Sequence, residues 1–333
     1  MSVEKQVEEA LGQVLVPGVR RNLLQMNLVR KIEVEDSKIN ISLSSTAISA
    51  QSQDWLKNKV SEAIKCIPEI HEVNLDFIEG KATEINQIKK IIAVMSGKGG
   101  VGKSLMAGLL AISFALEGNE VGILDADITG PSIPKMFGLS EHPGGDNGGI
   151  LPVLSKTGIE IMSMNLLLPN ENDAVIWRGP LLAKAVTQFW EEVLWGKLDY
   201  LIIDVPPGTG DIPLTLMQTI PLSGVINVYT PQDLTEMIVM KAIKMARKMN
   251  VRVLGIIENM SYLLIPETGQ KMEVFGRSKG KEMAEKAETS LLGKLPIDPE
   301  LARLCDQGKI EQYRSDFLSS ITSNLLAILH DKV

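Results

Sequence analysis

The fold is decided by residues 91–104, which read IIAVMSGKGGVGKS. The first five residues form an apolar run typical of a buried strand, and residues 97–104 have the glycine and lysine spacing of a phosphate-binding loop between a strand and a helix. Glycines in such a loop let successive backbone N–H groups point at phosphate oxygens. We therefore predict that a nucleoside triphosphate binds to Gly97, Lys98, Gly99, Gly100, Val101, Gly102, Lys103 and Ser104.

The polar side chains of this loop have different expected roles. Lys103 is expected to place a positive charge near the β and γ oxygens, and the Ser104 hydroxyl is expected to ligate Mg²⁺. Lys98 is an additional cation, which the loop does not need for its own nucleotide. We therefore expect Lys98 to reach a phosphate held by a second subunit, and a solvated loop lysine is the alternative. Lys98 and Lys103 are accordingly catalytic candidates.

The composition narrows the function classes. The chain has 333 residues, 44% of them hydrophobic and 23% charged, which suits two domains with sizeable cores. A formal net charge of −7 argues against general binding of a nucleic-acid backbone, so no nucleic-acid partner is expected. Glu4, Glu8 and Glu9 are unlike a secretory signal, and no stretch has the apolar length of a membrane span. We expect a cytoplasmic protein without a membrane partner.

Periodicity divides the chain into parts. Residues 1–80 are predicted to form a small α+β domain, because helical spacing over 3–14 and 55–64 alternates with strand-like alternation over 39–43 and 73–77. The polar residues 81–89 are interpreted as a linker. Residues 90–333 are predicted to form the ATPase domain. Within it, the Gly/Pro-rich residues 143–152 are interpreted as a flexible loop.

The second part has the pattern of a doubly wound α/β sheet. Apolar strand candidates alternate with helical segments, at 91–95, 121–124, 200–203, 225–229 and 253–257. Continuous apolar strands of this kind indicate a mostly parallel sheet covered on both faces. Ligands bind such sheets beyond the carboxyl ends of the strands. The phosphate-binding loop, Asp125, Asp204 and Asn259 all fall at those ends.

Two acidic segments supply candidates for phosphoryl-transfer chemistry. Asp204 and Asp125 end strand candidates and are assigned to the metal, while Asp127 is assigned to orienting the attacking water. Gly208, in the turn after Asp204, is expected to present its N–H to the γ-phosphate and to relax when that phosphate leaves. A strand-ending aspartate can also be a simple helix cap, and for Asp125 that alternative stays open.

Several motifs together resemble a known family. Residues 98–104 resemble the deviant Walker A loop of the MinD, ParA and nitrogenase iron protein class of dimeric ATPases. Across residues 88–330 the chain resembles the Mrp/ApbC family of iron–sulfur cluster carrier ATPases. That resemblance rests on DADITGPS at 125–132, WRGP at 177–180, DYLIID at 199–204, PPGTGD at 206–211 and ENMSY at 258–262. The first 80 residues resemble the small domain that precedes the ATPase in many bacterial Mrp proteins.

The resemblance implies a working arrangement. A homodimer is expected to sandwich two ATP molecules, with Lys98 crossing to the partner's nucleotide, Asp127 in the first switch and Asn259 at the adenine. ATP and Mg²⁺ are the implied cofactors, an iron–sulfur cluster is the implied cargo, and apo iron–sulfur clients or scaffold proteins are the implied partners. A lysine supplied in trans is expected to act as arginine fingers do.

The chain departs from the family at the cargo site. Ile265 and Thr268 occupy the two positions of the Cys-x-x-Cys pair through which a dimer supplies four thiolates. A cysteine common in the small domain is also replaced, with Ile48 near its place, and the glycine run after Gly276 is altered. The remaining cysteines, Cys66 and Cys305, are single and far apart in sequence, so each gives a dimer two thiolates at one site where a cluster usually needs four; a cluster at Cys305 with outside ligands is the alternative. We expect an intact ATPase that lacks the usual cluster ligands.

Two other functions stay open. A MinD/ParA-like positioning ATPase would need a basic amphipathic end or a DNA-binding patch, whereas residues 317–329 have a Ser/Thr/Asn polar face and residues 241–252 read as a solvated basic helix face. The second is a regulatory homologue that binds nucleotide without turnover. The retained aspartates Asp125, Asp127 and Asp204 make that second possibility less attractive.

Overall fold

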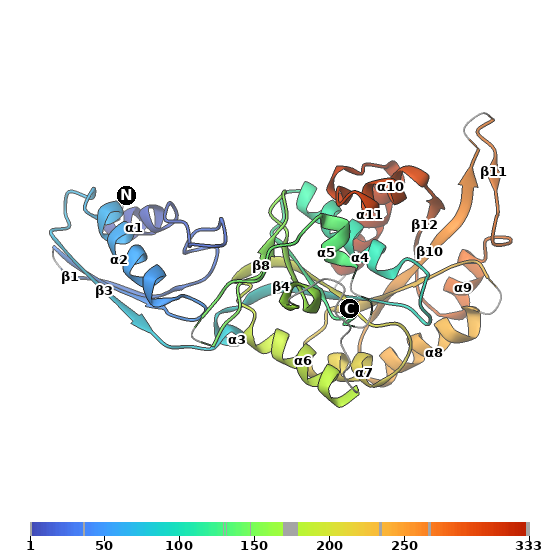
Figure 1. Ribbon diagram of the computed structural model, residues 1–333, viewed down its shortest axis with the longest axis horizontal. Helices are drawn as coiled ribbons and strands as arrows, with labels where there is room; N and C mark the ends of the chain where they lie inside the picture. Colours follow the sequence, from blue (N-terminus) through green and yellow to red (C-terminus); the bar gives the residue numbers. More distant parts are fainter. Residues whose placement is uncertain are drawn as a thin grey trace. The chain divides into compact units, whose positions relative to one another are not determined.

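The computed structural model describes residues 2–35, 37–128, 130, 132–146, 148–168, 179–232, 235–265 and 268–330 (Figure 1). Trp177 and Arg178, which belong to the motif at 177–180, lie outside these residues. The chain forms two compact units. The first comprises Met1–Lys89, His142–Leu154 and Gln188–Leu198, and the second Lys90–Glu141, Ser155–Thr187 and Asp199–Val333.

The first unit is a small α+β fold, as predicted. Its sheet has the order β1 (Val29–Glu35), β2 (Lys38–Ser44), β3 (Glu72–Ile78), with β1 antiparallel and β3 parallel to β2. The helices are α1 (Val3–Leu11) and α2 (Ala50–Ile64). Alternating residues of β2 and an apolar stripe of α2 are buried in one core, which is the physical reason for both periodicities. Strand β1 was not predicted, and Val14 was predicted to lie on the first helix, whereas α1 ends at Leu11.

Later segments of the chain complete this core. Residues 81–89, interpreted as a linker, contain α3 (Ala82–Ile85) and the start of β4 (Gln87–Met95). Ala82 and Ile85 are buried in the same core as Leu151 and Leu194. Leu151 belongs to residues 143–152, which were interpreted as a flexible loop. That interpretation did not foresee that Leu151 is buried in the core of the first unit. The domain boundaries at 80 and 90 stay a prediction.

A buried arginine joins these segments. Arg21 Nη1 donates to the carbonyl of Trp195 at 3.0 Å, and Nη2 donates to the carbonyl of Lys197 at 2.6 Å. Asn86 Oδ1 accepts from the backbone N–H of Trp195 at 2.8 Å. Polar side chains therefore fasten residues 188–198 to the amino-terminal part of the chain within this unit, and their own burial is compensated by these hydrogen bonds.

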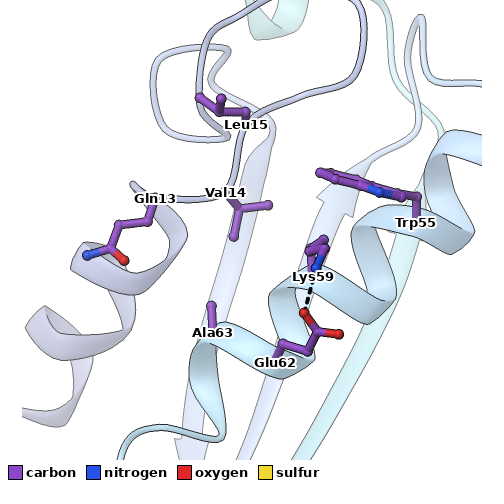
Figure 2. Close-up of a pocket in the computed structure, with 7 residues that line it drawn as sticks. All are labelled: Gln13, Val14, Leu15, Trp55, Lys59, Glu62 and Ala63. Carbon is purple, nitrogen blue, oxygen red and sulfur yellow. Dashed lines mark hydrogen bonds and ion pairs between the residues drawn. The ribbon is translucent and has the colours of Figure 1, made fainter.

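An open groove lies on the first unit (Figure 2). It has a volume of about 440 Å³ and is lined by Gln13, Val14, Leu15, Trp55, Lys59, Glu62 and Ala63. Its charged members neutralise one another, since Lys59 Nζ lies 2.7 Å from Glu62 Oε2. None of the site residues predicted from the sequence lines it.

The second unit is built on a mostly parallel sheet, as predicted. Within it the strand order is β11-β10-β9-β4-β8-β5-β7, β12 pairs with β10 off this path, and the residues of the short strand β6 belong to the first unit. The pairs β4–β9, β9–β10, β10–β12, β5–β7 and β5–β8 are parallel, and β11 is antiparallel to β10. The strands are β5 (Val121–Asp125), β6 (Val153–Leu154), β7 (Glu160–Ser163), β8 (Lys197–Asp204), β9 (Gly224–Tyr229), β10 (Val253–Leu264), β11 (Lys271–Met272) and β12 (Leu291–Ile297).

Helices cover both faces of this sheet. Figure 1 shows α4, α5, α10 and α11 on one face, and α7 and α8 on the other. The bounds are α4 (Lys103–Leu116), α5 (Ile133–Phe137), α6 (Gly179–Glu192), α7 (Asp211–Thr219), α8 (Thr235–Lys248), α9 (Gly280–Lys286), α10 (Pro299–Asp306) and α11 (Asp316–His330), with 3-10 helices at Met164–Leu167 and Ile310–Gln312. The apolar stripe of α11 is buried, as expected for a helix docked on the core. None of the described helices is both long enough and apolar enough to span a bilayer.

One strand pair leaves the sheet as a projecting arm. We define the arm as residues 262–265 and 268–276, which include the end of β10 and β11 (Figure 1). Its apolar side chains are unusually exposed, with Leu264 at 49% and Met272 at 50% of full accessibility. The two positions discussed above, Ile265 and Thr268, lie on this arm.

Candidate nucleotide site

The phosphate-binding loop joins β4 to α4, as predicted. Gly100 and Gly102 have φ of +76° and +82°, a backbone region that favours glycine. A Cβ at Gly97 would overlap Ile238 of α8, and a Cβ at Gly102 would overlap the Asn259 side chain. Three of the predicted glycines are thus required by the backbone conformation or by close approach of neighbouring elements.

Lys103 lies at the centre of the site and is buried. Its Nζ is 2.5 Å from Asp204 Oδ1 and 3.4 Å from Asp127 Oδ2. The same Nζ donates to Ser104 Oγ at 3.2 Å. The fold therefore brings together four predicted site residues from α4, β8 and the segment after β5.

Asp125 and Asp204 are paired across neighbouring parallel strands. They are register partners in β5 and β8, and both are fully buried. Asp125 accepts from Ser163 Oγ at 3.0 Å and from the Asp127 backbone N–H at 3.2 Å. Burial, followed by the charge of Asp204, holds the pKa of Asp125 well above its usual value. Burial also raises the pKa of Asp204, although Lys103 opposes that shift.

The donor set fits a divalent cation. Asp204 Oδ2 is buried and has no hydrogen-bond partner among the described residues, so one carboxylate oxygen beside Ser104 is available. No group of three or more His, Cys, Asp or Glu side chains in the described part of the chain forms a metal site by itself. That combination suits Mg²⁺, which is bound by few protein ligands together with phosphate oxygens and water.

The Lys98 side chain contacts a residue of its own chain in this structure. Its Nζ donates to Gln232 Oε1 at 2.5 Å, and its carbonyl accepts from Ser96 Oγ at 2.9 Å. Gln232 lies between β9 and α8, and the sequence analysis did not single it out. The crossing of Lys98 to a partner's nucleotide stays a prediction, and it requires the Gln232 contact to open.

Gly208 has a partner that the sequence analysis did not foresee. Its backbone N–H donates to the carbonyl of Ser96 at 2.8 Å, and its φ is +93°. The predicted contact of this N–H with a γ-phosphate stays a prediction, and that contact requires the bond to Ser96 to break. Such an exchange of partners is the behaviour proposed for a switch segment.

Asn259 lies against the phosphate-binding loop. Its Nδ2 donates to the Val101 carbonyl at 2.9 Å, and the side chain is buried. It is followed by Met260, a non-glycine residue with φ of +54°, and preceded by the buried Glu258. The adenine contact of Asn259 stays a prediction. Glu258 was quoted only within the motif 258–262 and was given no role, although an acidic residue directly after the apolar run 253–257 was a usable signal.

The predicted cargo positions contain no thiolate ligand. Ile265 N donates to the Gln270 carbonyl at 2.9 Å, so this part of the arm is held by backbone hydrogen bonds. Cys66 is exposed in the first unit, and Cys305 is half-buried on α10. Burial, with a smaller effect of Asp306, raises the pKa of the Cys305 thiol to about 11. Metal binding at Cys305 would therefore have to displace a proton that is held more firmly than usual.

Comparisons with known proteins agree with this geometry. Residues 87–331 match the family model described as NUBPL iron-transfer P-loop NTPase, and residues 4–75 match the model described as iron-sulfur cluster assembly protein. The iron-sulfur cluster carrier protein of Aquifex aeolicus is 37% identical over 93% of this chain and 92% of its own length.

Two solved structures resemble the fold of more than two thirds of the chain. A nucleotide-binding protein from Archaeoglobus fulgidus, solved with ADP, is 46% identical over 69% of this chain and 90% of its own, with a TM-score of 0.63. The MinC:MinD cell division protein complex of Aquifex aeolicus matches 73% of this chain and 97% of its own with a TM-score of 0.53. At 17% identity, that second similarity concerns the fold alone.

Proposed function

Because this chain belongs to the family of NUBPL-type iron-transfer P-loop NTPases, we propose that it binds and hydrolyses ATP and acts in iron–sulfur cluster assembly or transfer. The observation that carries the proposal is the convergence of Lys103, Asp127 and Asp204 beside the phosphate-binding loop. These groups come from three separate elements, and packing a stable fold does not require two acids and a lysine to be buried together.

The residues support a division of roles in hydrolysis. Lys103 exchanges its carboxylate partners for the β and γ oxygens, and Asp127, once released, orients the attacking water. Ser104, Asp125 and Asp204 would hold Mg²⁺, which supplies neutralisation of the charge that develops on the phosphate oxygens. Lys98 adds a positive charge from a second copy of the chain, so the proposed working form is a homodimer.

Hydrolysis is tested best at Asp127. Removing Lys103 would leave Asp204 buried without its cation, which destabilises the fold as well as the reaction. Asp127→Asn avoids that defect, and we expect it to lower kcat for phosphate release by roughly 10²- to 10⁴-fold. Affinity for ADP with Mg²⁺ should change little, because the phosphate-binding loop is untouched. Asp306→Asn, on the exposed end of α10, is the control; equal turnover in Asp127→Asn and wild type would refute the assignment.

The cluster is proposed as cargo that this chain handles without the usual cysteine pair. Ile265 and Thr268 cannot hold iron as thiolates do. We therefore expect anaerobic reconstitution with iron and sulfide, followed by gel filtration, to leave wild type without a stoichiometric cluster. The double variant Ile265→Cys/Thr268→Cys should gain cluster absorbance and iron. Stoichiometric iron and sulfide retained by wild type would show that other ligands serve, and that expectation would then be wrong.

A further inference from the structure

Glu258 is a buried acid that the proposed reaction does not use. It lies on β10 with no exposed surface. Its Oε2 accepts from Tyr229 Oη at 2.9 Å and from the Lys279 backbone N–H at 3.0 Å, and its Oε1 accepts from Ser261 Oγ at 2.5 Å. Three donors, none of them a charged side chain, therefore surround this carboxylate. A buried acid is costly, and this one is compensated by a fully built hydrogen-bond cage.

The cage holds a local irregularity of β10. Pairing with β12 shifts register twice, between Ile256 and Ile257 and again between Glu258 and Tyr262, and the second shift is the bulge. Met260, inside this bulge, has φ of +54°, which is unfavourable for a side chain other than glycine. The hydrogen bond from Ser261 to Glu258 spans the bulge and closes it. Asn259 is thereby presented to the phosphate-binding loop, where it donates to the Val101 carbonyl.

The other two donors come from segments with their own links to the site. Tyr229 ends β9, three residues before the Gln232 that accepts from Lys98. Lys279 lies where the chain returns from the arm to α9. Burial, followed by the charge of Glu258, raises the pKa of Tyr229, so the phenol stays protonated and donates. The Glu258 carboxylate is thus hydrogen-bonded to three parts of the chain. These are the bulge, the end of β9 that leads to Gln232, and the residues between the arm and α9.

We propose that Glu258 is a positioning residue of the nucleotide site, whose carboxylate fixes the bulge at 259–261 so that Asn259 supports the phosphate-binding loop at Val101. The inference rests on the proposed nucleotide binding and deepens it by assigning a residue that acts through Asn259. It does not require the cluster, the dimer or turnover.

A double-mutant cycle in the full chain tests this role, with ADP and Mg²⁺ as the probe and calorimetry as the measurement. Glu258→Gln puts an amide N–H₂ among three donors, and we expect ADP affinity to fall about tenfold, as for loss of a hydrogen bond to a charged group. In the Asn259→Ala background the same substitution should change the affinity less than twofold, because the route to the loop is already lost. A merely structural loss would act in both backgrounds, so equal fold-changes would overturn the proposal.

Two further variants keep the test decisive. Tyr229→Phe removes one hydrogen-bond donor and leaves the carboxylate, so it can replace Glu258→Gln if that variant does not fold. We expect Tyr229→Phe to lower ADP affinity by less than Glu258→Gln does. In the Asn259→Ala background it should leave ADP affinity unchanged. Tyr313→Phe removes a similar bond, from Tyr313 Oη to Asp298 Oδ2 at 2.6 Å, outside the site, and should leave ADP affinity unchanged. Wild type that does not bind ADP would overturn both the proposed function and this inference. Wild-type binding with unchanged affinity in Glu258→Gln would overturn this inference alone.

Discussion

At the scale of single residues, Asp125 and Asp204 place more negative charge in the core than Lys103 neutralises. Both carboxylates are buried at one strand edge, and only Asp204 contacts the lysine directly at 2.5 Å. Buried carboxylates without a matching cation destabilise the folded chain when no ligand is bound, and the same negative charge favours binding of a cation. If the site holds Mg²⁺ and phosphate as proposed, it exchanges some stability for that binding, as functional sites commonly do.

This exchange predicts a pH dependence of stability. Because the pKa of Asp125 is raised in the folded state, this carboxyl binds more protons in the folded than in the unfolded chain above its unfolded pKa of about 3.9, and its contribution to stability changes with pH. The free energy of unfolding should therefore decrease as pH rises from about 4 through the folded pKa. Asp125→Asn removes this loss and should raise stability at pH 8 by about 1 kcal/mol.

The measurement is thermal unfolding in EDTA, without nucleotide, from pH 4 to pH 8. The Tm advantage of Asp125→Asn should shrink as the pH falls, since wild-type Asp125 is then protonated in both states. Asp316→Asn, on the exposed first turn of α11, is the control. A constant difference between Asp125→Asn and wild type at every pH would contradict the prediction.

At the scale of elements, the site depends on how neighbouring elements approach the phosphate-binding loop. Ile238 of α8 leaves no space for a side chain at Gly97, and Asn259 of β10 leaves none at Gly102. The loop is therefore held between two elements that follow it by more than 100 residues in sequence. Its conformation is preorganised by packing as well as by its glycines.

Contacts between segments distant in sequence are also expected to stabilise the first unit. Arg21 donates to the carbonyls of Trp195 and Lys197, which are then buried with a partner. A lysine at this position has no guanidinium group and cannot donate to both carbonyls. We therefore expect Arg21→Lys to lower the free energy of unfolding, measured with denaturant, by about 2 kcal/mol. Arg20→Lys is the matched control, because Arg20 is the exposed neighbour and should tolerate the change. A loss in Arg21→Lys no larger than that in Arg20→Lys would contradict the role given to the two guanidinium hydrogen bonds.

At the scale of the whole molecule, the proposed dimer explains why Lys98 is present. In this structure Lys98 contacts Gln232 of its own chain. Its proposed contact with the nucleotide of a partner subunit requires a second copy of the chain. Lys98→Ala should keep ADP affinity and lower kcat by about 10³-fold or more, the order expected for a cationic finger.

Mixing two inactive variants separates the trans role from a cis role. A heterodimer of Lys98→Ala with Asp127→Asn has one site with both groups intact if Lys98 acts in trans. Random exchange of subunits makes about half of the dimers in an equimolar mixture heterodimers, so we expect phosphate release to recover toward roughly a quarter of the wild-type rate, while each variant alone stays inactive. No recovery, together with monomers by gel filtration in a nonhydrolysable ATP analogue and Mg²⁺, would contradict the dimer.

The sequence by itself determined the fold class and most of the strands. Continuous apolar runs at 91–95, 121–124 and 225–229 become central strands because burial on both faces demands apolar side chains throughout. The strand-end positions of Asp125 and Asp204 followed from the same rule, because parallel strands place their carboxyl ends at one edge. Local patterns of this kind depend on spacing within one element, which a sequence records directly.

Tertiary structure alone decided which groups are paired. Gln232 beside Lys98, the Ser96 carbonyl on Gly208 and the Glu258 cage all join residues from different elements, and no local period encodes such partners. The packing of 143–152 and 81–89 into the first core was missed for the same reason, because polar and glycine-rich composition describes a segment but not what lies against it. Chain spacing sets the shape of each element, whereas contacts across long sequence separations set the chemistry of the site.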